Sequence, residues 1–78
     1  MAPRSKTKDR DVTRTVTRKT FIRQLRRLAN RLERGERFAV TIGKERIALP
    51  REVEFSIEHE REAGATEELE FQVRWRGR

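Results

Sequence analysis

The chain has 78 residues, a formal net charge of +7 and no cysteine, with 42% charged and 33% hydrophobic residues. This length predicts one domain with a thin core, and the lack of cysteine excludes disulfides, iron–sulfur clusters and thiolate zinc sites. No stretch approaches the ~20 apolar residues of a membrane-spanning helix, and no secretory signal is visible, so we expect a cytoplasmic location.

The positive charge is concentrated in the first half of the chain. Residues 1–37 hold 13 lysines and arginines against four acids, whereas residues 38–78 hold seven against nine glutamates. The two parts therefore carry net charges of +9 and −2. Such asymmetry indicates an anionic partner rather than a particular fold. We expect residues 1–10 to form a flexible basic tail and residues 11–78 to form a single domain.

The clearest helix signal lies between residues 19 and 34. Its apolar residues are spaced four, three and four apart, which is the period of an amphipathic helix. They are Phe21, Leu25, Leu28 and Leu32, with Ile22 and Ala29 beside them. Either Thr17 or Thr20 suits the N-cap, and Gly35 suits the position of positive φ after the last turn. The preceding segment, 11–17, is rich in Val and Thr and is compatible with a short edge strand.

The residues after Gly35 alternate between apolar and polar side chains, which is the period of a β-strand. One such run covers residues 38–42, and a second covers residues 47–49. Between them, Gly43 and Lys44 are typical of a turn. The pattern therefore predicts a β-hairpin directly after the helix.

Two longer alternating runs, at residues 53–60 and 69–76, flank a turn region at residues 63–65. Each run has one apolar and one charged face, and antiparallel sheets of this kind are covered on one face only. The sequence thus predicts an α+β domain. One amphipathic helix packs on one face of an antiparallel β-meander of about four strands, with the short N-terminal edge strand as an optional addition.

Several residues of the helix, the hairpin and the last strand share the arrangement of a known family. They are Leu25, Leu28, Ala29, Leu32, Gly35, Ile47, Leu49, Pro50, Val53 and the run Leu69 to Trp75. On these residues the chain resembles the amphi-Trp domain family from about Thr13 to Trp75, and the closing strand is the most specific part. Members are small bacterial or archaeal domains without an established activity. The resemblance therefore implies the fold and transfers no catalytic or ligand residue.

No pattern typical of an active site is present. The one histidine, His59, continues the apolar face of its strand, while Glu58 and Glu60 point to the opposite face. Ser56 lies on that opposite face too, so a serine–histidine pair has no suitable geometry. The glutamates of the two long strands are read as a solvated acidic surface. We therefore predict a non-enzymatic protein without cofactor or metal ion, in which Trp75 caps the core or, alternatively, offers a stacking surface.

The side of the helix away from the leucines is rich in basic residues. We predict that they bind phosphate groups, because guanidinium groups match phosphate geometry and counterion release supplies affinity. The predicted site residues are Lys19, Arg23, Arg26, Arg27, Arg31 and Arg34. The leading prediction is low-specificity binding of DNA or RNA, assisted by the basic tail. The alternative is a protein-interaction or self-assembly module, in which these residues meet an acidic protein or the acidic sheet surface of another copy.

Overall fold

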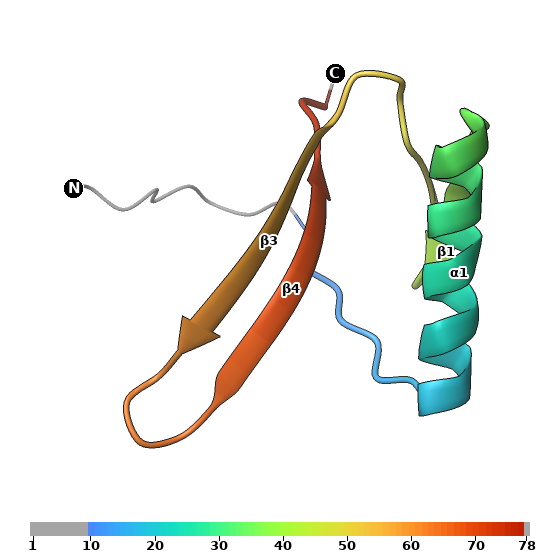
Figure 1. Cartoon of the computed structure of the whole chain (residues 1–78). Helices are drawn as coiled ribbons and strands as arrows, with labels where there is room; N and C mark the ends of the chain where they lie inside the picture. The colour runs from blue at the N-terminus through green and yellow to red at the C-terminus, as the bar shows by residue number, and fades with distance from the viewer. Residues whose placement is uncertain (1–9, 78) are drawn as a thin grey trace. The chain divides into compact units, whose positions relative to one another are not determined.

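The computed structural model describes residues 10–77, so nearly all of the expected basic tail lies outside the described residues. The described part contains one helix and four strands (Figure 1). They are α1 (Arg18–Arg34), β1 (Ala39–Ile42), β2 (Glu45–Ala48), β3 (Glu54–Arg61) and β4 (Glu67–Arg74). β1 pairs with β2 and β3 with β4, both antiparallel, in two two-stranded sheets. The predicted α+β class is confirmed, and a meander is consistent with this strand order.

The chain divides into two compact units, Met1–Ala48 and Leu49–Arg78. The first unit holds α1 and the β1–β2 hairpin, and the second holds the β3–β4 hairpin. Each unit is described by itself. The expectation of a single domain over residues 11–78 stays a prediction.

The segment before α1 contains no strand, so the optional edge strand at residues 11–17 is not formed. Side-chain contacts of Arg10 tie this segment to the β1–β2 hairpin instead. The Arg10 Nη2 donates to the Ile42 carbonyl at 2.7 Å, and its Nε lies 3.1 Å from the Glu45 carboxylate. The guanidinium group of Arg10 makes these contacts, so the segment is attached to the hairpin without backbone hydrogen bonds between strands. The Val and Thr residues therefore do not form a strand, despite their β-propensity.

α1 begins and ends at two capping residues. Thr17 has an extended backbone, and its side-chain oxygen accepts a hydrogen bond from the Thr20 N–H at 3.2 Å, so Thr17 is the N-cap. Gly35 adopts a left-handed φ of 68°. Its N–H donates to the Leu32 carbonyl, and the N–H of the next residue donates to the Arg31 carbonyl. This pair of bonds closes the last turn in a Schellman motif.

Phe38 marks the centre of the first unit. It lies directly before β1 and is only 7% exposed, and it is the one hydrophobic side chain among residues 10–77 that is buried. The hairpin that follows pairs Val40 with Ile47, and its turn contains Gly43 at a φ of 67°. The predicted hairpin and its Gly43-Lys44 turn are thus confirmed.

The register of the β3–β4 hairpin separates apolar from acidic side chains, as the alternating pattern predicts. On the first face, the cross-strand pairs are Phe55–Val73, Ile57–Phe71 and His59–Leu69. On the second, called the acidic face below, they are Glu54–Arg74, Ser56–Gln72, Glu58–Glu70 and Glu60–Glu68. The large apolar side chains of the first face are 59–67% exposed for Phe55, Ile57, Leu69 and Phe71. Within its own unit, the hairpin therefore leaves this face largely uncovered.

The left-handed Gly35 provides a test of how α1 ends. A Cβ added at Gly35 meets no atom within 4 Å, so Gly35→Ala costs stability through its backbone conformation alone. We expect a loss of about 1 kcal/mol, because an L-residue with a Cβ is strained in this region. Thermal unfolding followed by circular dichroism measures it. Gly77→Ala is the control, since Gly77 has no positive φ and also has open space around it; an equal loss in both variants would contradict the assignment.

Candidate nucleic-acid interface

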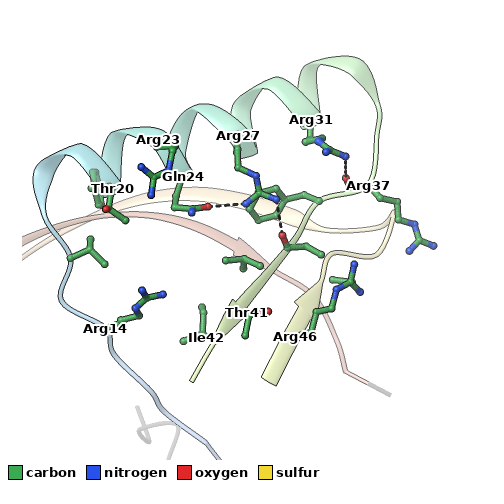
Figure 2. Close-up of a pocket in the computed structure, with 16 residues that line it drawn as sticks. Arg14, Thr20, Arg23, Gln24, Arg27, Arg31, Arg37, Thr41, Ile42 and Arg46 are labelled. Carbon is green, nitrogen blue, oxygen red and sulfur yellow. Dashed lines mark hydrogen bonds between the residues drawn. The ribbon is translucent and has the colours of Figure 1, made fainter. Parts of the chain in front are cut away.

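The first unit contains a cleft between α1 and the β1–β2 hairpin (Figure 2). Six arginines from four parts of the chain line it. They are Arg14 before α1, Arg23, Arg27 and Arg31 on α1, Arg37 after α1, and Arg46 on β2. No carboxylate is among the described residues that line this space. We call it the arginine cleft, and its local charge is strongly positive.

The β1–β2 hairpin contributes side chains from both of its faces to the cleft. Ala39 lies opposite Ala48, and Thr41 lies opposite Arg46, so these four residues share one face of the hairpin. All four line the cleft. Val40 and Ile42, on the other face of the hairpin, line the cleft as well.

Arg27 joins α1 to the hairpin at the base of the cleft. Its Nη2 donates to the Ala39 carbonyl at 3.1 Å, and its Nη1 donates to the Gln24 side-chain oxygen at 2.8 Å. Its guanidinium carbon lies 4.9 Å from the centre of the Phe38 ring, which is within cation–π range. Arg27 is half-buried, so these contacts hold its positive charge in one place.

Arg31 and Arg34 are partly compensated by an acid at the end of the helix. The Arg31 Nη1 donates to the Arg37 carbonyl at 3.1 Å, and its Nε lies 3.9 Å from the Glu36 carboxylate. The Arg34 Nη1 lies 3.8 Å from the other oxygen of Glu36. These contacts are long and exposed, and such surface pairs contribute little energy. Both arginines therefore remain available to an incoming anion.

Four arginines of the cleft have no intramolecular partner among residues 10–77. They are Arg14, Arg23, Arg37 and Arg46, whose guanidinium groups make none of the hydrogen bonds or ion pairs found in the described part of the chain. Each guanidinium group can offer a planar set of donors to a phosphate. The cleft thus presents four cationic groups without internal partners, beside Arg27 and Arg31, which make internal hydrogen bonds.

The structure sorts the six predicted site residues into two groups. Arg23, Arg27 and Arg31 line the cleft, whereas Lys19, Arg26 and Arg34 do not and lie exposed on α1. Arg27 differs from the other two in the cleft because it contacts both Phe38 and Ala39. The sequence analysis missed the cleft arginines outside the helix. They are Arg14, Arg37 and Arg46. Only the strand alternation, which puts Arg46 on the same face of the hairpin as Ala39 and Ala48, could have indicated one of them.

The single histidine has a carboxylate partner that sequence spacing did not reveal. His59 Nε2 lies 3.0 Å from the Glu67 carboxylate on the neighbouring strand, and Arg61 Nη2 lies 3.5 Å from the same oxygen. All three side chains are exposed. Ser56 lies on the opposite face of the hairpin, where its hydroxyl donates to Gln72. The described residues thus bring no serine to this histidine.

The acidic face of the β3–β4 hairpin brings like charges together. Glu58 lies opposite Glu70 and Glu60 opposite Glu68, and such pairs repel. The repulsion, first from Glu70 and then from Glu60, raises the pKa of Glu68 above its ordinary value. Gln72 relieves part of the repulsion between Glu58 and Glu70, because its side-chain amide donates to Glu70 at 2.7 Å and to Glu58 at 3.3 Å. Even so, no group of three potential ligands among residues 10–77 is arranged to hold a metal ion.

Trp75 follows β4 and is about one-third exposed, beside Val53 and Arg74 of its own unit. Its expected role as a cap against the helix stays a prediction. In the described part of the chain, no helix combines the length and apolarity needed to span a membrane.

Comparison with protein families gives a match over nearly the whole chain. The model described as the Amphi-Trp domain covers residues 5–78, which is nearly the whole chain. The chain belongs to the Amphi-Trp domain family. The resemblance read from the helix, the hairpin and the closing strand is therefore confirmed. Searches of curated proteins and of solved structures found no match.

The role of Arg27 in this Amphi-Trp domain can be tested by truncation. We expect Arg27→Ala to lower the free energy of unfolding by about 1–2 kcal/mol, because it removes a cation–π contact and a charged hydrogen bond to Ala39. Arg26→Ala is the matched control, since Arg26 is exposed on the same helix and outside the cleft. Denaturant unfolding measures both. Equal stability of the two variants would contradict a structural role for Arg27.

Proposed function

We propose that this Amphi-Trp protein is a non-enzymatic binding module for nucleic acid, of low sequence specificity, that acts in the cytoplasm. The observation that supports it is the arginine cleft, where six arginines surround a space without a carboxylate among its described lining. The phosphate backbone supplies most of the affinity in such binding, and arginine forks fit phosphate oxygens in bidentate pairs.

The distribution of the arginines favours a polyanion over a small anion. They come from the segment before α1, from α1, from its connection to β1 and from β2. A single phosphate engages one or two guanidinium groups, whereas a chain of phosphates can engage all of them in turn. Lys19, Arg26 and Arg34 extend the positive surface along the exposed side of the helix. Contacts of this kind go to the backbone, which carries no sequence information directly.

Binding of fluorescein-labelled DNA and RNA, measured by anisotropy at several salt concentrations, tests the proposal. With about four phosphate contacts, the association constant should fall about 50- to 150-fold between 50 and 200 mM salt. Arg23→Glu/Arg46→Glu should weaken binding strongly, because it replaces two free cationic groups of the cleft with acids.

The matched control is Arg51→Glu/Arg76→Glu, which makes the same change of charge on exposed residues of the second unit. It should retain most of the affinity. Absence of binding at low salt would reject the proposal. An equal loss in both double variants would show that net charge, and not the cleft, governs binding.

The acidic face favours a second candidate function, self-assembly. Glu58 and Glu70 oppose each other directly, as do Glu60 and Glu68, and the resulting repulsion would be relieved by positive charge from another molecule. The arginine-rich side of α1 on a second copy is complementary to it. Such a contact joins two different surfaces, so it would produce rings or open chains rather than two-fold dimers.

Glu58→Gln/Glu70→Gln separates the two candidates. If copies assemble head to tail, this variant should sediment as a smaller species than the wild type at low salt, while its nucleic-acid binding is kept or strengthened. Glu52→Gln/Glu67→Gln changes the charge equally at exposed positions outside the acidic face and should sediment as the wild type does. A monomeric wild type at low salt would reject self-assembly, and loss of nucleic-acid binding in a folded Glu58→Gln/Glu70→Gln variant would count against the leading proposal.

A further inference from the structure

We infer that the arginine cleft accepts single-stranded nucleic acid, with its phosphates on the arginines and a base stacked on Phe21. This inference rests on the proposed nucleic-acid binding and specifies its ligand. Three observations carry it: the narrowness of the cleft, the placement of the arginines, and an open aromatic ring among them.

The cleft is narrow because one side chain spans it. Arg27 extends from α1 and donates to the carbonyl of Ala39 on β1, so the two walls are one arginine side chain apart at the base. A duplex is wider than this distance, since its major groove alone is about 12 Å wide. Its bases are also stacked inside and cannot reach the cleft walls. A duplex would therefore meet the outer side of α1 rather than enter this space. A single strand presents a backbone thin enough for the cleft.

The arginines stand on both sides of the space. Arg23 and Arg31 belong to α1, whereas Arg46 belongs to β2 on the opposite wall. A strand lying between the walls can meet guanidinium groups from either side along its backbone. Grooves that follow a single-stranded backbone with positive charge, and that add aromatic rings for the bases, are the common design of proteins that bind single strands without sequence preference.

Two phenylalanines line the cleft, and only one is open to a base. The ring of Phe38 is buried and lies beneath the Arg27 guanidinium. Phe21 also lines the cleft, and 59% of its surface is exposed. Such a ring can stack on any base, because every base has a π-face. Phe21 therefore adds affinity for unpaired bases without adding sequence preference, which agrees with low specificity.

The first test compares a labelled single strand of about 12 nucleotides with a duplex of the same length, since single-strand sites span roughly 4–16 nucleotides. We expect the single strand to bind at least about tenfold more tightly. Its binding should be weakened much more by Arg23→Glu/Arg46→Glu in the cleft than by Arg26→Glu/Arg34→Glu on the outer helix surface. Equal or tighter binding of the duplex, lost in the Arg26→Glu/Arg34→Glu variant, would overturn this inference while the proposed function stands. Absence of binding to either probe would reject the proposed function itself.

The second test addresses the stacked base. Phe21→Leu removes the ring and keeps an apolar side chain, and we expect it to weaken single-strand binding about tenfold with an unchanged salt dependence. Leu25→Ala is the control, because Leu25 is exposed on the same helix but does not line the cleft. Circular dichroism verifies that both variants are folded. An equal effect of the two variants would overturn the role of Phe21.

A probe without bases gives an independent answer, because it changes the ligand instead of the protein. A strand of abasic sites keeps the phosphates but offers nothing to stack. The wild type should bind it about tenfold more weakly than the ordinary strand, and Phe21→Leu should bind both strands alike. If the wild type binds the abasic strand as tightly as the ordinary one, base stacking is absent and the inference fails.

Discussion

The contact of Arg27 with Phe38 and Ala39 is the interaction on which the first unit depends. Small domains usually dock a helix through apolar side chains, but here a half-buried guanidinium covers the buried ring and bonds the first residue of β1. A charged hydrogen bond is directional, so it fixes the distance between α1 and the hairpin. The same residue thus joins α1 to the hairpin and lines the cleft.

This mode of docking explains why positive charge gathers in one place. The polar side of α1, with Gln24, Arg27 and Arg31, faces the hairpin, while the apolar residues Leu25 and Leu32 lie outside the cleft and stay exposed. Arginines of the helix are therefore brought close to arginines of neighbouring segments. Few acids of the chain neutralise these arginines, so most of their mutual repulsion remains. A bound phosphate chain would therefore meet cations that are already assembled.

Periodicity and capping rules were enough to predict α1, the two hairpins and their turns, because those features depend on residues close together in the chain. These rules could not predict which side of α1 contacts the β1–β2 hairpin. An amphipathic period shows that one side is apolar, but it does not show which side a given hairpin will contact. The convergence of Arg14, Arg37 and Arg46 depends on tertiary placement, as does the contact between His59 and Glu67 across two strands.

The glutamates of the β3–β4 hairpin have a further consequence, for solubility. Each strand of a two-stranded sheet has an open edge, and its apolar side chains are exposed, which is the kind of surface on which strands of other molecules add. Identical strands stacked in register would place Glu58 on Glu58 and Glu70 on Glu70. Rows of like charge along a growing sheet are unfavourable, so the carboxylates that weaken a single hairpin also oppose its extension into a fibril.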